Sequence, residues 1–404
     1  MLYFRLCKID NSGILLSNHA MNLLFKFLVA TTLITFAGFE KPVIKTQAPL
    51  PQPATAKIQA AILLDVSGSM DGLIEQAKAL LWNMVVTLGK AKCTDQSSPT
   101  VELALYEYGR DNNEEAKGYV TQLSPFTSDL DEVSKILFSL ATDGGEEYCG
   151  QVIYTAMDEL KWDASAANYK VIFIAGNEDF LQGNLHYTKS CAKAKEKGVI
   201  VNTIYCGDYQ RGIAEHWNLA GECGNGSFSH INQDAKEPDI PTPYDTTLIV
   251  LNSKLNKTYI GYGSAGFANT IRQEEVDQLN YSTSKGVASK RIEAKAKSNV
   301  YNNASWDLVD ANKADSTYIA NVNKNTLPDS LKNKSTAELK QVVNEKTKER
   351  KAIQAEIISV NSKRTDYITE QKVKTALNKI EPTLESAVEK VIKEQVKRFS
   401  MTID

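Results

Sequence analysis

The chain has 404 residues, of which 42% are hydrophobic and 24% charged. This is the composition of an ordinary folded protein, which excludes collagen-like and wholly disordered chains, and the length predicts two or three domains. The formal net charge is −3, but residues 57–240 carry 15 basic and 27 acidic residues (net −12), whereas residues 331–404 carry 16 and 11 (net +5). An acidic body with a mildly basic C-terminal region argues against nucleic acid as a partner.

The first 40 residues have the pattern of a secretory signal peptide. An apolar run at 27–39 follows Lys26, and it is shorter than the roughly 20 residues of a transmembrane helix. Met21 is a candidate true start, and an uncleaved membrane anchor is the alternative. Residues 41–56 hold four prolines and are expected to form an extended linker. We therefore expect an exported protein, periplasmic, cell-envelope associated or secreted, with no transmembrane span after cleavage.

Cysteine content limits the disulfide chemistry of the exported chain. Removal of the signal peptide leaves an odd number of cysteines, which allows at most two bridges in an oxidising compartment. Their connectivity cannot be deduced from the sequence, and buried apolar thiols are the alternative. The five residues are Cys93, Cys149, Cys191, Cys206 and Cys223.

An alternation of apolar runs and amphipathic segments indicates an α/β domain over residues 57–240. Strands that are apolar on both faces, separated by helices, predict a doubly wound, mostly parallel sheet with helices on both faces. Ligands of such sheets bind beyond the carboxyl ends of the strands. The predicted strands are 58–65, 101–109, 169–176 and 198–207, and the helical patterns are 73–88, 133–140 and, less clearly, 186–197.

Three oxygen-bearing side chains follow the first predicted strand at alternate positions: Asp65, Ser67 and Ser69. Alternation directs them to one side of a tight turn, and such oxygens suit a hard divalent cation. Mg²⁺ is the expected ion, with Mn²⁺ or Ca²⁺ as further candidates. The alternative is that Ser69 only caps the helix that begins near Asp71.

The segment LLDVSGSM (63–70) resembles the D-x-S-x-S signature of von Willebrand factor type A (VWA) domains, and the resemblance covers about residues 57–235. It implies a doubly wound sheet with a metal-ion-dependent adhesion site (MIDAS), in a domain class that mostly binds other proteins. The chain is also similar to a bacterial exported subgroup of VWA proteins with a C-terminal helical region. That similarity depends on YEYG (106–109), GGEEYCG (144–150), VIFIAGNE (171–178) and NTIYCG (202–207).

Two loops of the implied site depart from the family pattern. The second loop usually reads Gly-Gly-Thr with Thr as a ligand, and here Glu146 stands at the Thr position. The third usually reads Thr-Asp-Gly, and here Gly176 replaces the Asp, with Asn177 and Glu178 next to it. We expect Asp65 and the two serines to bind the cation together with Glu146, and Asn177 and Glu178 are further candidate ligands. Loss of metal binding is the alternative.

The C-terminal region 329–404 is expected to be helical. Residues 339–367 form a partial heptad seam that Lys346, Arg350 and Arg364 interrupt. These interruptions favour a helical hairpin over a coiled coil that self-associates or binds a partner. The preceding segment, 241–328, is expected to be a partly ordered connection with one strand or hairpin and then helix.

Together these features predict an exported, non-enzymatic binding or adhesion protein. Its partner would be a protein, of unknown identity, that offers an acidic group to the metal. A metal-independent scaffold in a cell-envelope complex is the alternative. A Cys-dependent hydrolase is a third hypothesis, although no complete catalytic motif is present.

Overall fold

The computed structural model describes residues 56–235, 239–374 and 382–403. The predicted signal peptide and nearly all of the predicted linker lie outside these residues. Within them, no helix is both long and apolar enough to cross a membrane.

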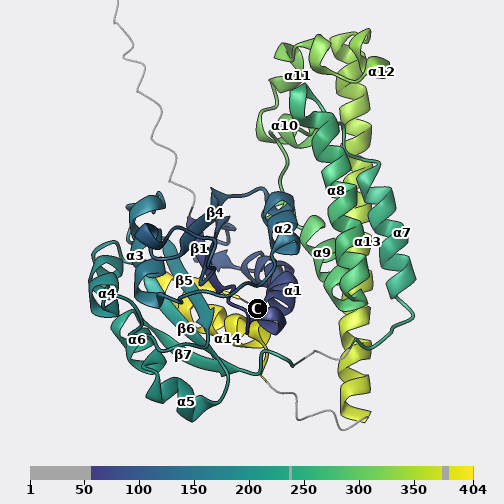
Figure 1. Ribbon diagram of the computed structural model, residues 1–404. Coiled ribbons are helices and arrows are strands. Elements are labelled where there is room, and N and C mark those ends of the chain that lie inside the picture. The colour runs from purple at the N-terminus through teal and green to yellow at the C-terminus, as the bar shows by residue number, and fades with distance from the viewer. Residues whose placement is uncertain (1–55, 236–238, 375–381, 404) are drawn as a thin grey trace, which may run out of the picture. The chain divides into compact units, whose positions relative to one another are not determined.

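The central element is a sheet of six strands in the order β4-β3-β1-β5-β6-β7, counted over the described residues. All neighbouring strands are parallel except the β3–β4 pair at one edge. This arrangement confirms the predicted doubly wound sheet (Figure 1). The strands are β1 (Lys57–Asp65), β3 (Thr100–Tyr108), β4 (Val120–Thr127), β5 (Tyr169–Gly176), β6 (Ile200–Cys206) and β7 (Asn225–Ile231).

The two edge strands, β4 and β7, are absent from the sequence-based prediction. Most residues of both strands are only half-buried, because each strand has a neighbour on one side only. Their sequences, VTQLSPFT and NGSFSHI, accordingly lack the continuous apolar run of the inner strands. A separate two-stranded ribbon joins β2 (Lys92–Cys93) to β8 (Met401–Thr402).

Helices cover both faces of the sheet, and β1 shows how the faces divide. Ile58, Ile62 and Leu64 belong to the core on one face, and Ala61 and Leu63 to the core on the other. The first core is closed by α1 (Asp71–Leu88), α2 (Leu130–Ser139) and α14 (Leu384–Gln395), and the second by α3 (Cys149–Glu159), α4 (Tyr187–Glu196) and α6 (Trp217–Cys223). Two short helices, α5 (Tyr209–Ala214) and η1 (Glu115–Lys117), also lie between residues 56 and 231.

Helices, not a strand or hairpin, fill the segment that was expected to be a partly ordered connection, so that expectation is wrong. The only β feature there is an isolated bridge between Gly261 and Asp307. Helices α8 and α9 bury many polar and charged side chains, which removes the apolar periodicity that would have identified them. The helices are α7 (Asp245–Asn256), α8 (Gly263–Thr283), α9 (Lys285–Lys295), α10 (Leu308–Ala314), α11 (Tyr318–Asn321), η2 (Lys324–Thr326) and α12 (Asp329–Lys332).

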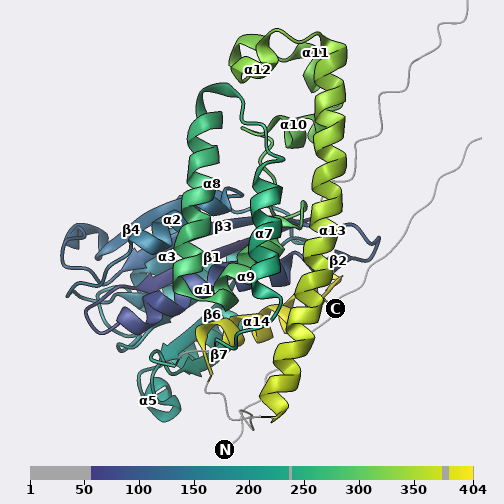
Figure 2. The same cartoon turned by 90° about the vertical axis from the view of Figure 1, so that its right-hand side faces the viewer.

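The predicted C-terminal helices are confirmed as α13 (Thr336–Lys374) and α14, followed by η3 (Val396–Phe399). They pack against different elements: α13 lies against α7, α9 and α10, and α14 lies against α1 (Figures 1 and 2). The arginines that interrupt the α13 seam are ion-paired inside the chain. Arg350 Nη1 lies 2.7 Å from Asp307 Oδ2, and Arg364 Nε lies 2.8 Å from Asp245 Oδ1.

The return of α14 shows that α7–α13 are inserted into the α/β domain. Asn232 N donates to Pro382 O at 3.2 Å, so the two ends of the insertion lie next to each other. Gln76 of α1 joins both, because its Nε2 donates to Gln233 O and its Oε1 accepts from Leu384 N, each at 2.7 Å. The α/β domain therefore consists of 57–235 and 382–403, not of the single segment 57–240.

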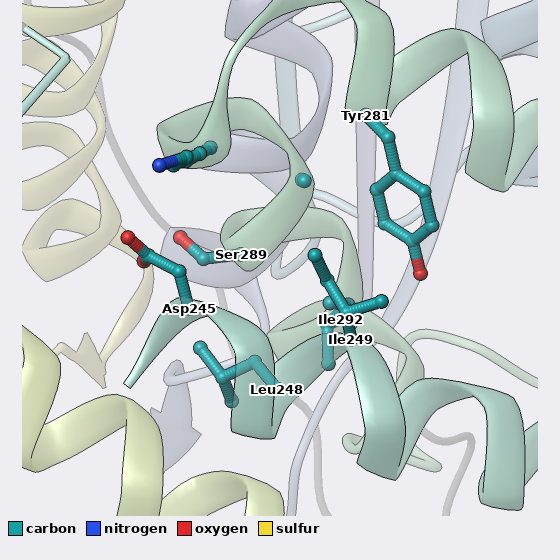
Figure 3. Close-up of a pocket in the computed structure, with 8 residues that line it drawn as sticks. Asp245, Leu248, Ile249, Tyr281, Ser289 and Ile292 are labelled. Carbon is teal, nitrogen blue, oxygen red and sulfur yellow. The ribbon is translucent and has the colours of Figure 1, made fainter. Parts of the chain in front are cut away.

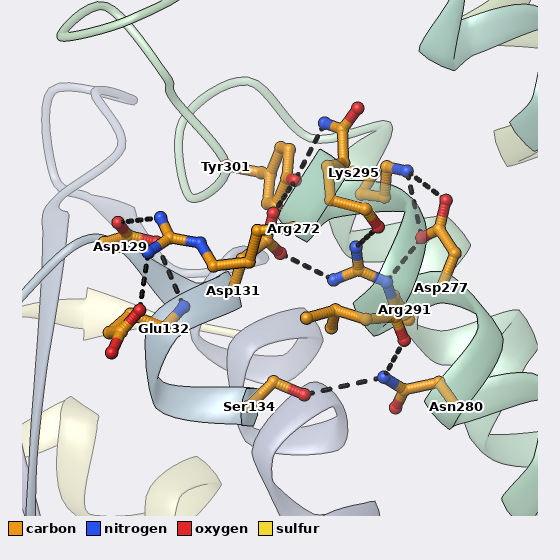
Figure 4. A network of polar contacts seen from close by, with 12 residues as sticks. Asp129, Asp131, Glu132, Ser134, Arg272, Asp277, Asn280, Arg291, Lys295 and Tyr301 are labelled. Carbon is orange, nitrogen blue, oxygen red and sulfur yellow. Dashed lines mark hydrogen bonds and ion pairs between the residues drawn. The ribbon is translucent and has the colours of Figure 1, made fainter. Parts of the chain in front are cut away.

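A buried network of charged residues connects the insertion to α2 (Figure 4). Arg291 of α9 is fully buried, and its Nη1 lies 2.7 Å from Asp131 Oδ1 of α2. Its Nε lies 2.6 Å from Asp277 Oδ1 of α8, whose Oδ2 is 3.0 Å from Lys295 Nζ. Tyr301 donates from its hydroxyl to Asp131 Oδ2 at 2.7 Å.

Candidate functional site at the carboxyl end of the central strand

The D-x-S-x-S residues lie together at the carboxyl end of β1, as predicted. Ser67 N donates to Asp65 Oδ1 at 2.8 Å, and the Ser67 and Ser69 hydroxyl oxygens are 3.4 Å apart. The following helix α1 begins at Asp71 with Met70 as its N-cap, and no side chain caps it. The motif therefore does not serve as a helix cap.

Asp65 is the buried group of this site, with 0% of its surface exposed. Its Oδ2 has no hydrogen-bond partner among the described residues. Burial raises the pKa of Asp65 to about 6, although hydrogen bonds from Ser67 oppose the shift. A buried carboxylate oxygen without a partner is costly to keep charged, and a bound cation would satisfy it. These residues therefore fit a hard divalent cation.

The third loop contributes an amide. Asn177 Nδ2 donates to Ser69 Oγ at 3.1 Å, and its buried Oδ1 has no partner among the described residues. Glu178 follows it, and its negative charge contributes to the raised pKa of Asp65, after burial. The structure thus brings both further candidates, Asn177 and Glu178, to the motif loop.

Gly176 is required by close packing at the end of β5. A Cβ atom there would lie 2.4 Å from Tyr108 Oη and 2.9 Å from Asp65 Oδ2. The Tyr108 hydroxyl donates to Ala175 O at 3.0 Å and so is held in place. No side chain fits at position 176, where the family pattern has an Asp.

The second loop places Glu146 and Glu147 differently. Glu146 is exposed, and its Oε2 accepts from Gln182 Nε2 at 3.4 Å. Glu147 is 7% exposed and lies over Gly109, beside Asp65. Burial raises the pKa of Glu147 to about 7, and the charges of Asp65 and Glu178 add to the shift. The match to the family's Gly-Gly-Thr pattern placed Glu146 at the Thr position and so missed Glu147. The only signal for Glu147 in the sequence was that a second carboxylate follows Glu146 in GGEEYCG.

The donors of this site are mixed in kind. No group of three or more His, Cys, Asp or Glu side chains within the described residues is arranged to hold a metal ion. Any cation here would instead depend on the Asp65 carboxylate, the serine hydroxyls and the Asn177 amide. Neutral oxygens combined with few carboxylates suit Mg²⁺, Mn²⁺ or Ca²⁺ rather than a soft metal.

Two of the cysteines, Cys149 and Cys206, lack the properties of a nucleophile. All five within the described residues are free thiols. Cys149 is buried and donates to Tyr108 Oη at 3.7 Å, and burial raises its pKa well above the ordinary value. Burial raises the pKa of the Cys206 thiol in the same way. Because the thiolate is the reactive form, these two positions do not support a Cys-dependent hydrolase.

Two cavities were compared with the site. The first cavity has a volume of about 510 Å³. It adjoins the site because Gln233, which lines it, donates from Nε2 to Ser69 O at 2.9 Å. Its lining residues are Cys206, Gly207, Asp208, His230, Asn232, Gln233, Asp234 and Pro382. The other lies among α7, α8 and α9 beside Asp245 and Tyr281 (Figure 3). Its volume of about 30 Å³ has room for little more than a water molecule.

Comparisons with known proteins add to this description. No family model matches the sequence, and no curated protein matches it. Among solved structures, an aerotolerance-related membrane protein from Bacteroides fragilis aligns at 16% identity over 44% of this chain and 93% of that chain, with a TM-score of 0.31. The SpRpn10 VWA domain aligns at 16% identity over 43% and 87% (TM-score 0.32). Proximal thread matrix protein 1 from the mussel byssus, with a zinc-occupied MIDAS motif, aligns at 12% identity over 44% and 41% (TM-score 0.32).

These similarities are low and assign no family to the chain. The sheet order places β1 between β3 and β5, and the D-x-S-x-S motif lies at the carboxyl end of that central strand. Both features are those that the resemblance of the sequence to VWA domains implies. The α7–α13 insertion is additional to the α/β domain that holds them.

Proposed function

We propose that this protein is an exported, non-enzymatic binding protein whose VWA domain engages a protein partner through a divalent cation at the carboxyl end of β1. The observation that carries the proposal is the buried Asp65 carboxylate, whose Oδ2 lacks a partner among the described residues while two serine hydroxyls lie beside it. Most buried polar atoms in folded proteins have a hydrogen-bond partner, so this oxygen is a position where a bound cation would supply one.

The residues of the motif have separate roles in this proposal. Asp65 supplies the fixed negative charge from inside the domain, and Ser67 and Ser69 supply neutral oxygens. Ser67 is buried and Ser69 is exposed, so the site opens to solvent on the Ser69 side. A cation bound there would offer a coordination position to an oxygen of the partner, and Mg²⁺ is the expected ion.

The partner is proposed to be a protein that presents an acidic side chain. Such a side chain would approach from the exposed Ser69 side, where the larger cavity begins. The export proposal depends on the signal-like segment at 27–39.

Titration calorimetry with Mg²⁺ and Mn²⁺ tests the cation. We expect wild type to bind one ion and Asp65→Ala to bind none, with circular dichroism showing that the variant is folded. Asp95→Ala is the matched control, because Asp95 is an exposed aspartate in a surface turn. No heat of binding in wild type at millimolar ion would remove the cation from the proposal.

The metal-independent scaffold is the competing function, and partner capture separates the two. Tagged wild type and Asp65→Ala are incubated with a native envelope extract, with and without a chelator. Capture that is lost in both the variant and the chelated sample supports the adhesion site. Capture of the same partner in all samples supports the scaffold.

A further inference from the structure

The Asp65 carboxylate lies between two glycines that end the neighbouring strands. Gly109 follows β3 and has a φ of +86°, which favours glycine, and Gly176 ends β5. A Cβ at Gly109 would be 3.1 Å from Asp65 Oδ1, and one at Gly176 would be 2.9 Å from Asp65 Oδ2. These two glycines mark the sides on which an acidic side chain from a neighbouring strand or loop could reach Asp65.

The Gly176 side is closed. The Tyr108 hydroxyl fills the space that a side chain at 176 would enter, and its hydrogen bond to Ala175 O keeps it there. Tyr108 is fully buried, so it has no solvent-exposed position to move into. A carboxylate on β5 at this position is excluded by packing.

The Gly109 side holds Glu147. Its Cγ lies 2.8 Å from the same Cβ position that is 3.1 Å from Asp65 Oδ1. Glu147 Cγ and Asp65 Oδ1 are therefore no more than about 6 Å apart, so the Glu147 side chain lies next to the Asp65 carboxylate. The backbone of this loop is held by Glu147 N, which donates to Gln182 Oε1 at 2.9 Å, and by Cys149 N, which donates to Glu147 O at 3.1 Å.

Glu146 is directed elsewhere, although it precedes Glu147. It is exposed, and its contact with Gln182 Nε2 at 3.4 Å is at the edge of hydrogen-bonding distance. The pair thus offers two identical side chains in adjacent positions, one buried beside Asp65 and one in solvent. Only the buried side chain, Glu147, is placed to share a cation with Asp65.

We propose that Glu147, not Glu146, is the second carboxylate of the cation site, and that it replaces the family's Asp at the position of Gly176. The proposal rests on the function proposed above. The carboxylate moves from the β5 side of Asp65 to the β3 side, and the number of carboxylates is unchanged. Two carboxylates together with hydroxyl and amide oxygens select a hard divalent cation.

Glu147→Gln and Glu146→Gln form a matched pair for the test, since each removes one charge and keeps the shape of the side chain. Calorimetric titration with Mn²⁺ should show affinity falling at least about tenfold in Glu147→Gln and less than about twofold in Glu146→Gln. The melting temperature of each ion-free variant is measured as well, and Glu147→Gln should melt no lower than wild type because it removes a buried like charge beside Asp65.

Three outcomes decide between the proposals. If wild type binds Mn²⁺ and Glu147→Gln binds as tightly, the assignment of Glu147 is overturned while the cation site stands. If Glu146→Gln loses affinity and Glu147→Gln does not, the sequence-based assignment of Glu146 is correct instead. If wild type does not bind Mn²⁺, both the proposed cation site and the assignment of Glu147 are wrong. Glu147→Asp checks specificity, and it should recover part of the lost affinity without changing the ion-free melting temperature.

Discussion

At the residue scale, the candidate site depends on how closely backbone and side chains approach Asp65. The motif at 65–69 was recognisable from sequence because alternate oxygens after an apolar strand have a direct geometric meaning. The ligand of the second loop was not recognisable from sequence, because it depends on which of the adjacent residues Glu146 and Glu147 faces inward. Glu147 is inward-facing only because Gly109 leaves room for it, a contact between segments 38 positions apart.

Gly176→Ala tests the packing around Asp65. The added methyl group would overlap Tyr108 Oη and Asp65 Oδ2, so we expect a loss of about 1–3 kcal/mol in the free energy of unfolding, measured by urea denaturation. In a Tyr108→Phe background the same substitution should cost less, because the nearest overlapping atom is gone.

Gly68→Ala is the control for that experiment. A Cβ at Gly68 meets no atom within 4 Å, although this glycine lies in the same site. We expect its stability to stay within about 0.5 kcal/mol of wild type or to rise slightly. An equal loss for Gly68→Ala and Gly176→Ala would contradict the packing argument.

At the element scale, the insertion is connected to the α/β domain by charged groups. Arg291, Lys295 and Asp277 are buried on α8 and α9, and Asp131 is buried on α2. Each charge has a partner, so removing one leaves another buried without compensation. The position of α9 on α2 is therefore specified by ion pairs as well as by apolar packing.

Asp277→Asn should destabilise the protein by about 3–5 kcal/mol, because it leaves Lys295 and Arg291 without their shared carboxylate. Glu275→Gln is the control on the same helix. Its ion pair with Lys135 is 53% exposed on both side chains, and its loss should cost at most about 1 kcal/mol. Urea denaturation at pH 7 measures the free energy of unfolding of both variants. Similar losses would show that the buried ion pairs stabilise the fold no more than the exposed one.

The effect of Asp277 should also depend on pH. Burial disfavours its charged form, but Lys295 and Arg291 outweigh burial and hold the pKa of Asp277 well below its usual range. Its contribution to stability is therefore complete above the unfolded pKa of about 3.9 and is lost as pH falls below that value. The other polar contacts of its carboxylate are the neutral amides of Asn252 and Asn256.

We expect the stability difference between wild type and Asp277→Asn to shrink between pH 4 and pH 2. Urea denaturation of both proteins at pH 7, 4, 3 and 2 provides the comparison. A difference that stayed constant over this range would show that the Asp277 charge does not stabilise the fold.

At the scale of the whole molecule, the described chain is an α/β domain interrupted by helices. The last segment, 382–403, closes the core over α1 with buried apolar side chains: Leu384, Val388, Val391, Ile392, Val396 and Met401. The two ends of the insertion lie next to each other, and Gln76 forms a hydrogen bond to the chain at each end. The domain should therefore depend more on its last 22 described residues than on the insertion.

Two shortened chains test this dependence. A chain that ends at residue 374 loses the α14 side chains, each worth about 1.5–3 kcal/mol when buried, and the total approaches the 5–15 kcal/mol stability of a typical protein. We expect it to lose cooperative thermal unfolding. A chain that joins 56–235 to 382–403 through a short Gly/Ser linker should keep it, because the two ends are adjacent. The opposite ranking would contradict the two-segment domain.

The sequence by itself determined the doubly wound sheet, its central strands and the D-x-S-x-S motif, because continuous apolar runs and alternate oxygens act over a few neighbouring residues. Tertiary structure alone decided that the domain closes with α14, that α13 packs inside the chain, and that Glu147 rather than Glu146 lies beside Asp65. Each of these depends on contacts between distant segments: Pro382 with Asn232, Arg350 with Asp307, and Glu147 with Gly109. The local sequence pattern contains no information about such contacts, because the partner of each residue lies far away in the chain.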